Sequence, residues 1–342
     1  MKKFTILSLM FVVIFSACSK PSQALTVPSA SALDLDIEVN VSATPLPTPN
    51  PTMCPTEASS TADCHRIAFA MFNYQNKEQP DIYTVCPNGS QMTRLTDDPA
   101  VDENPAWSPD GRRLAFTSDR TGSYQVYLMD ADGNHVTQVT KDYNNTLPVW
   151  LPDGSRIAFL TNDGKGLWWW RIANLDGSQI TQFTTPSYDF FFQTPAWSPD
   201  GRKMAYMSLE EQKERNDGAS QIHVKNIDGS RDVALTHDTW ENAYPIWSPD
   251  GQQIAFLSER HGEYNIFALY VMRADGSHVR QLSRPIYGDA YTRYSWSPDG
   301  TQIAIGDINT GRIDIISIAT GETHHLLELD EGEAVFSPSW QP

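Results

Sequence analysis

Trp107-Ser108-Pro109-Asp110-Gly111 is a five-residue stretch that this 342-residue chain repeats. Proline fixes the backbone at the first central position of a tight turn, aspartate tolerates the second, and glycine supplies the left-handed residue that closes a hairpin. Each copy therefore predicts a turn between two antiparallel strands. Identical copies begin at Trp197, Trp247 and Trp296, and a Trp-Leu-Pro-Asp-Gly variant begins at Trp150.

The tryptophans of these turns, together with Trp340, mark a regular period. They are spaced by 43, 47, 50, 49 and 44 residues, which is the length of one four-stranded blade of a β-propeller. Each turn is followed by an apolar run such as Leu114–Ser118, then by a variable loop, a third strand with its own turn, and a short fourth strand. Continuous apolar runs are typical of strands buried on both faces. We therefore expect an all-β fold and interpret the tryptophans as packing between blades.

The two ends of the repeat region complement each other. Residues 65–96 contain the last three strands of a blade without a preceding Trp turn, whereas Ser337–Trp340 reproduces a first strand that only Gln341 and Pro342 follow. A ring closed in this way leaves no free sheet edge. The sequence thus predicts six blades of four antiparallel strands, with the first blade closed by the C-terminal strand.

The N-terminal residues indicate export and lipidation. Lys2 and Lys3 precede an apolar run that is too short to span a membrane. Ser16-Ala17 directly before Cys18 resembles the lipobox of bacterial lipoproteins, in which the cysteine is acylated; an ordinary secretory peptide is the alternative. We expect a lipoprotein signal peptide at 1–17, a disordered Pro/Ser/Thr-rich tether at 18–61 and the propeller at 62–342. The protein would then be extracytoplasmic and membrane-anchored in the cell envelope.

The formal net charge of −17 disfavours nucleic acid as a partner. The eight histidines are scattered over the repeats, and no spacing of His or Cys is typical of a metal site. The repeated aspartates, including Asp110, are interpreted as turn formers. We expect no cofactor, and the sequence leaves the metal content open.

The connections between blades should share one face with the long loop 209–220. These connections (97–104, 141–146, 185–194, 237–244, 284–294 and 330–336) contain twelve acidic and three basic residues. They also carry many aromatic residues, Tyr294 among them. An acidic, aromatic surface is typical of a site for a protein or peptide partner, although such loops can also be plain surface. The candidate binding residues are Tyr143, Phe191, Trp240, Glu241, Tyr244, Asp289 and Tyr291.

The Trp-Ser-Pro-Asp-Gly, Ile-Ala-Phe, Ser-x-Arg (Ser118–Arg120, Ser258–Arg260) and Asp-Gly-Ser series resembles the repeats of the TolB-type β-propeller family over about residues 62–342. The resemblance implies a propeller that takes partner segments in the cell envelope. In place of the additional N-terminal α/β domain of TolB, this chain has the predicted tether. We expect a monomeric, membrane-tethered, non-enzymatic binding protein.

An envelope enzyme acting on carbohydrate, a lyase or a hydrolase, is the alternative function. A metal-dependent lyase needs converging His or Gln ligands, and the connections between blades offer only His237 and Gln193. A serine hydrolase would need a Gly-x-Ser-x-Gly motif, which does not occur in the chain.

Three cysteines remain after Cys18. Alignment with the second blade puts Cys64 at the position of Gly111 and Cys86 at that of Asp130, opposite each other on antiparallel strands. The sequence favours a Cys64–Cys86 disulfide, while Cys54–Cys64 stays open because a short flexible loop closes easily.

Overall fold

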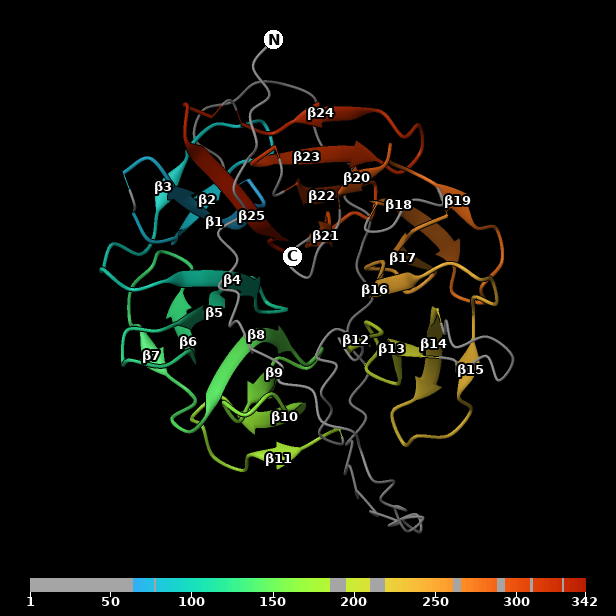
Figure 1. The fold of residues 1–342 in the computed structure, drawn as a ribbon, viewed down its shortest axis with the longest axis horizontal. Coiled ribbons are helices and arrows are strands. Elements are labelled where there is room, and N and C mark those ends of the chain that lie inside the picture. Colours follow the sequence, from blue (N-terminus) through green and yellow to red (C-terminus); the bar gives the residue numbers. More distant parts are fainter. Residues whose placement is uncertain are drawn as a thin grey trace, which may run out of the picture. The chain divides into compact units, whose positions relative to one another are not determined.

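The computed structural model describes residues 64–76, 78–184, 195–209, 219–260, 266–287, 293–307, 310–327 and 329–342. Within these residues, six antiparallel sheets surround a central axis (Figure 1). The described part contains no α-helix, and so none that is long and apolar enough to cross a membrane. The predicted six-bladed β-propeller is confirmed.

Each blade runs from an innermost to an outermost strand. The innermost strands of blades 1 to 6 are β25 (Glu333–Trp340), β4 (Asp102–Trp107), β8 (Asn144–Trp150), β12 (Ala196–Trp197), β16 (Asn242–Trp247) and β21 (Tyr294–Trp296). The second strands are β1 (Ile67–Asn73), β5 (Arg113–Ser118), β9 (Arg156–Asn162), β13 (Lys203–Leu209), β17 (Gln253–Ser258) and β22 (Gln302–Asp307). The third are β2 (Asp81–Val85), β6 (Gln125–Asp130), β10 (Trp168–Asn174), β14 (Ser220–Asn226), β18 (Ile266–Arg273) and β23 (Arg312–Ser317). The outermost are β3 (Thr93–Arg94), β7 (Thr137–Gln138), β11 (Thr181–Gln182), β15 (Val233–Ala234), β19 (Arg280–Gln281) and β24 (Thr323–His325), and β20 (Ile286–Tyr287) adds to blade 5.

The C-terminal strand closes the ring, as predicted. β25 pairs with β1, with Trp340 opposite Ile67. The backbone N–H of Trp107 in blade 2 donates to Ser339 Oγ (3.2 Å), and the N–H of Trp340 donates to Ser295 Oγ of blade 6 (3.0 Å). The last strand thus joins three blades. Blade 1 is also crosslinked, because a disulfide joins Cys64 and Cys86, whose Cα atoms are 5.7 Å apart.

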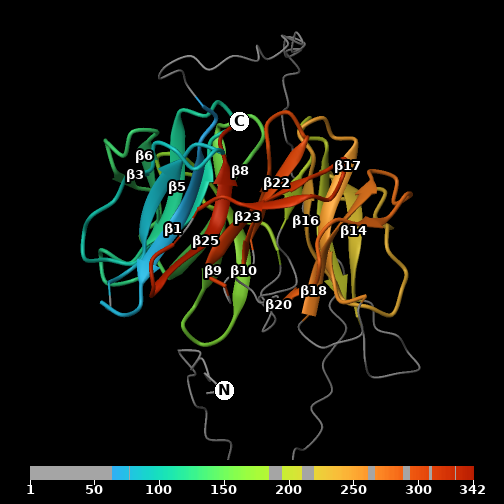
Figure 2. The same ribbon diagram turned by 90° about the horizontal axis from the view of Figure 1, so that it is seen from above.

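The hairpin turns after the innermost strands lie on the face where the chain ends, which we term the turn face. The connections between blades and the loops between second and third strands lie on the opposite face, the loop face, where β20 is seen in Figure 2. On the turn face, Ser108 Oγ donates to Asp110 Oδ1 (2.6 Å) and accepts the N–H of Arg113 (2.9 Å). The bond from Ser108 lowers the pKa of Asp110. Equivalent bonds form at Ser198, Ser248 and Ser297, so these aspartates hold turns.

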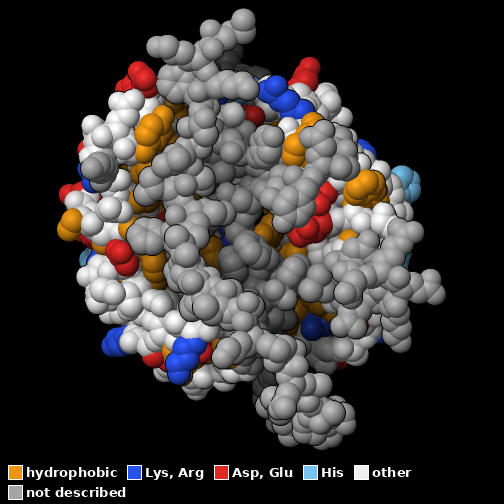
Figure 3. Space-filling model, viewed as in Figure 1, with side chains coloured by type: hydrophobic (Ala, Val, Ile, Leu, Met, Phe, Trp, Pro, Cys, Tyr) orange, Lys and Arg blue, Asp and Glu red, His pale blue; other side chains and the backbone are white. Residues whose placement is uncertain are grey.

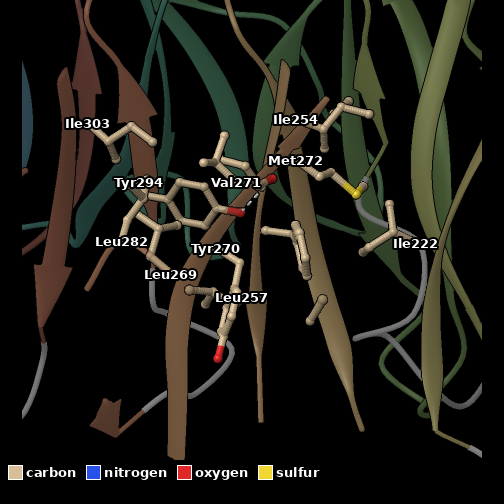
Figure 4. Packing of buried hydrophobic residues seen from close by; sticks show 14 of the residues in the cluster. Ile222, Ile254, Leu257, Leu269, Tyr270, Val271, Met272, Leu282, Tyr294 and Ile303 are labelled. Carbon is tan, nitrogen blue, oxygen red and sulfur yellow. Dashed lines mark hydrogen bonds between the residues drawn. The ribbon is translucent and has the colours of Figure 1, made fainter. Parts of the chain in front are cut away.

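The seams between blades are filled by the repeat tryptophans, all of which are buried. The indole N–H of Trp150 donates to the carbonyl of Ala106 in the preceding blade (3.0 Å), and Trp247 bonds to Ala196 in the same way (3.1 Å). Tyr294, expected in a loop, instead belongs to β21 and occupies the place where the other blades have proline. It is buried in the seam between blades 5 and 6, and its hydroxyl donates to the carbonyl of Ala255 (3.3 Å; Figure 4).

The innermost strands extend further toward the loop face than the sequence predicts. Residues 102–104, 144–146, 242–244 and 333–336 were expected in connections but belong to β4, β8, β16 and β25. A β-bulge lets each strand continue past its proline, which cannot donate a ladder hydrogen bond. The residue before the proline is left-handed in each of the four, at Asn104, Leu147, Tyr244 and Ser337. The outermost strands are only two or three residues long, shorter than expected.

Candidate functional site on the loop face

Two exposed aromatic residues occupy equivalent positions on the loop face. Tyr143 lies two residues before Asn145 in the connection into blade 3, and Trp240 lies two residues before Asn242 in the connection into blade 5. Their side chains are 54% and 38% exposed. Large aromatic side chains that stay exposed provide contact area at low entropy cost, which suits recognition of a partner.

Both aromatic residues are held by their backbones. Gln125 Nε2 on β6 donates to the carbonyl oxygen of Tyr143 (2.7 Å). Asn242 Nδ2 donates to the carbonyl oxygen of Trp240 (2.9 Å), and Gln221 Nε2 on β14 lies 3.4 Å from it. The sequence suggested the exposed rings but not these amide clamps, because two of the amides, Gln125 and Gln221, lie on β6 and β14 rather than in the connections.

Tyr143 is the more constrained of the two. Its φ of 53° is unusual for a bulky residue, and such strain persists only where the surroundings enforce it. Its ring contacts Trp169 edge-on, with centroids 5.5 Å apart, and the guanidinium of Arg171 lies 5.7 Å from its centroid. Arg171 is itself fixed by two 3.0 Å bonds to the carboxylate of Asp142. The tyrosine is therefore presented in one orientation.

Part of the acidic character expected of this face is offset, because four of the acidic residues pair with arginines. Arg120 pairs with Asp98 (2.8 Å) and Asp102 (3.0 Å), Arg260 pairs with Asp238, and Arg171 pairs with Asp142. Counting charges within the connections missed these arginines, since each lies elsewhere in the blade that the connection leads into. The Ser-x-Arg motif was the available signal for Arg120 and Arg260. On the face seen in Figure 3, acidic and basic side chains are accordingly interspersed around the rim.

Asp102 is the most buried of these acids, at 0% exposed. Burial raises its pKa, and the bonds from Ser118 and Arg120 oppose that rise. The pair with Arg120 thus compensates a charge placed inside a seam, and it leaves little of that charge to attract a ligand.

The acid that keeps an unusual environment is Glu103, near the loop-face end of the innermost strand of blade 2. It is half-buried on β4. Burial raises its pKa to about 7; repulsion from Asp119 adds to the rise, while Asn104 and Arg293 oppose it. Near neutral pH this carboxyl exists in both protonation states.

Of the seven predicted binding residues, the structure describes four. Tyr143 is exposed where blade 2 meets blade 3, and Trp240 is exposed where blade 4 meets blade 5, so blades 3 and 4 lie between the two rings. Glu241 is half-buried beside Trp240, and its pKa is raised by burial and by Glu259. Tyr244 is half-buried under the guanidinium of Arg293, 5.7 Å from the ring centroid. Phe191, Asp289 and Tyr291 lie outside the described residues.

The histidines and acids of the described ranges form no group of three or more that could hold a metal ion. His223 contacts Asp232 (3.2 Å) and His325 contacts Asp314, each within its own blade. The described residues of the loop face therefore provide exposed aromatic rings, fixed ion pairs and one carboxyl with a raised pKa.

Comparison with known proteins identifies relatives of this architecture. A family model described as the TolB β-propeller domain matches residues 56–190 and 191–342. The Tol-Pal system protein TolB of Bordetella pertussis is 47% identical over 53 residues, which are 15% of this chain and 12% of the relative. The match thus spans only about an eighth of that protein's length.

Solved structures share the fold. TolB from Acinetobacter baumannii superposes with a TM-score of 0.69 at 22% identity, covering 81% of this chain and 67% of the other. A putative TolB from Agrobacterium tumefaciens gives a TM-score of 0.56 at 21% identity, covering 82% of this chain and all of the other. At such identities the likeness concerns architecture alone.

Proposed function

Because this chain belongs to the TolB β-propeller domain family, we propose that it is a non-enzymatic binding protein that holds a peptide segment or protein partner on its loop face. The observation that carries the proposal is the pair of equivalent exposed rings, Tyr143 and Trp240, each clamped through its backbone. Rigid aromatic anchors contribute much of the binding free energy at protein interfaces. The relatives named as Tol-Pal system proteins support a role in an assembly of proteins.

The test is capture of envelope proteins by the full-length mature protein, quantified by mass spectrometry. The variant carries Tyr143→Ala and Trp240→Ala together, and the matched control carries Met92→Ala and Val233→Ala, two exposed apolar residues beside or on the outermost strands. We expect the aromatic variant to lose at least tenfold of a specific captured partner, since each anchor contributes about 1–2 kcal/mol, and the control to retain it. Equal capture by both variants would assign the partner to another surface.

We further propose that the protein is exported and anchored through an acylated Cys18, with residues 18–61 as the tether and the propeller as a monomer. The charged and small residues that flank the apolar run before Cys18 support this proposal. Cys18→Ser should release the protein from the membrane fraction or stop its processing. A variant that stays fully membrane-bound and is processed normally would contradict lipidation.

A further inference from the structure

Tyr143 and Trp240 hold equivalent places, but in the described part of the chain only Tyr143 packs against a second aromatic ring. That ring belongs to Trp169, which lies at the loop-face end of β10 in blade 3 and is half-buried. The planes of the two rings make an angle of 79°, and their centroids are 5.5 Å apart. Two rings at nearly a right angle form an aromatic corner, which we define by Tyr143 and Trp169.

One side of the Tyr143 ring is already occupied. The guanidinium carbon of Arg171 lies 5.7 Å from the ring centroid, and the Arg171 side chain is only 12% exposed although it is charged. Tyr143 itself is 54% exposed. The exposed area of its ring therefore belongs to the face and edges that Arg171 and Trp169 do not contact, and this part of the ring is open to a ligand.

The polar groups next to the corner are engaged by one another. Arg171 donates two hydrogen bonds of 3.0 Å to the carboxylate of Asp142, and Gln125 Nε2 donates to the carbonyl oxygen of Tyr143 (2.7 Å). The corner thus has no unpaired carboxylate to attract a cation, and a cation would be repelled by Arg171. A saccharide would also find few partners for its hydroxyl groups, and it would meet two crossed rings in place of one flat platform.

Trp169 supplies one polar group that a ligand can use. Its indole N–H donates to no group among the described residues, and it is accessible, whereas the indole N–H of the adjacent Trp170 is buried. The corner therefore suits a ligand that combines an apolar ring with a hydrogen-bond acceptor. Proline in the polyproline II conformation has both, because its backbone carbonyls are not used internally and it has no N–H to desolvate. Segments of this kind dock in aromatic-lined sites at low entropy cost.

We propose that the aromatic corner of Tyr143 and Trp169 binds a proline of the partner segment in the polyproline II conformation, with the Trp169 indole N–H donating to a backbone carbonyl of that segment. This inference rests on the proposed binding function and specifies the chemistry of the partner at one of the two exposed rings. The corner is preformed, since the surroundings of Tyr143 enforce its φ of 53°. Binding then requires little ordering of the protein.

The experiment titrates the full-length mature protein with N-acetyl-hexaproline amide and follows the heat of binding and the NMR signal of the Trp169 indole N–H. An N-acetylated alternating alanine–serine hexapeptide amide and chitohexaose are the comparison probes. We expect hexaproline to bind at least about tenfold more tightly than either, and to shift the indole signal. Tyr143→Ala and Trp169→Ala should each weaken hexaproline binding about tenfold, as expected for an aromatic anchor.

Two conservative variants separate ring contact from hydrogen bonding. Tyr143→Phe keeps the ring and should retain the affinity. Trp169→Phe also keeps a ring but loses the N–H, and should weaken binding about fivefold, the effect of one hydrogen bond. Tyr74→Ala is the matched control, because it removes a 60% exposed ring from the loop after β1 in blade 1. It should leave hexaproline binding unchanged.

Equal affinity for hexaproline and the alanine–serine peptide, hexaproline binding that survives in both Tyr143→Ala and Trp169→Ala, or tighter binding of chitohexaose would each overturn the inference. Its failure is distinguishable from failure of the proposed function. Partner capture that is lost in the Tyr143 and Trp240 double variant, from a protein that does not bind hexaproline, would retain the binding role and remove only the preference for proline.

Discussion

Blades 2 and 5 lie opposite each other in the propeller. In both, the first residue of the innermost strand pairs with a serine, but this residue is Asp102 in blade 2 and Asn242 in blade 5. Asp102 of blade 2 lies opposite Ser118, and Asn242 of blade 5 lies opposite Ser258. Both blades supply an arginine two residues after the serine. Each arginine stacks on two aromatic rings, Phe116 and Tyr127 in blade 2, and Phe256 and Tyr270 in blade 5.

In blade 2 the arginine is drawn into the seam. Arg120 donates to both carboxylate oxygens of Asp102 (3.1 and 3.0 Å), to Ser118 Oγ (2.9 Å) and to Asp98. In blade 5, Arg260 bonds to Asp238 alone among the described residues. Ser258 Oγ and Asn242 Oδ1 are left without a hydrogen-bond partner in that part of the chain.

The side-chain amide of Asn242 donates two hydrogen bonds within the connection that leads into blade 5. It donates to Asp238 Oδ1 and to the carbonyl of Trp240, both at 2.9 Å, and so fixes the exposed indole. The residue of blade 2 that corresponds to Trp240 is Ala100, which is 8% exposed. Asp102 thus closes its seam with an ion pair, whereas Asn242 fixes the backbone of an exposed ring. Two substitutions between repeats, Asp102 to Asn242 and Ala100 to Trp240, thus accompany the change from a seam closed by an ion pair to a seam that carries an exposed ring.

Among the substitutions considered for the two blades, Arg120→Ala should lower the free energy of unfolding most. Removing this arginine leaves the buried charge of Asp102 uncompensated, and we expect the free energy of unfolding to fall by about 3 kcal/mol. Arg260→Ala should cost about 1 kcal/mol, because its partner Asp238 is partly exposed. Urea denaturation of the two variants measures the difference. Equal losses would show that the two seams are equivalent in energy.

A second test uses Glu103, for which blade 5 has Ala243. Because the pKa of Glu103 in the folded protein, about 7, exceeds its ordinary value of 4.5, the folded state binds more protons between these values. Stability should therefore fall as the pH rises from about 4.5 to about 7. Glu103→Gln should remove this loss, so that its free energy of unfolding at pH 8 exceeds that of the wild type by about 3 kcal/mol.

The two proteins should be similar in stability at pH 4, which serves as the internal control. Denaturation at a series of pH values provides the measurement, and Glu322→Gln tests whether any exposed carboxylate has the same effect. If Glu103→Gln leaves the pH dependence of the free energy of unfolding unchanged, the pKa of Glu103 is not raised in the folded protein.

The smallest effect is expected for the two serines. Ser118→Ala loses the bond from Arg120 and the contact with Asp102, and should cost about 1.5 kcal/mol. Ser258→Ala removes a hydroxyl that has no partner among the described residues, and should be neutral within about 0.5 kcal/mol. Thermal unfolding of both variants checks the order. A larger loss for Ser258→Ala would mean that its hydroxyl bonds to a group not yet assigned.

Much of the architecture could be predicted because the signals are local and repeated. The chemistry of Pro109-Asp110-Gly111 determines a turn wherever it occurs, and the intervals between tryptophans set the size of a blade. The unmatched strand at Ser337–Trp340 predicted the closure of blade 1. The opposition of Cys64 and Cys86 followed from the same alignment, and the structure joins them.

The candidate site was predictable only in part. The exposure of Tyr143 and Trp240 agrees with their positions in connections between blades, but Tyr294, from the same set, is buried in a seam. Tyr294 occupies the place that proline has in the other blades, so it belongs to β21 and its ring packs in the seam. The connections themselves are shorter than expected, because the innermost strands of four other blades continue past a bulge.

The number of blades, their turns and the closure of the ring could all be derived from the sequence, since each depends on residues close in the chain or on counting repeats. The tertiary structure alone decided which charges remain effective. Arg120 pairs with both Asp98 and Asp102, and Arg293, nearly 200 residues further along the chain, lowers the pKa of Glu103 against the effect of burial. The physical reason is that an electrostatic interaction depends on distance and burial in space, and neither can be read from separation in sequence.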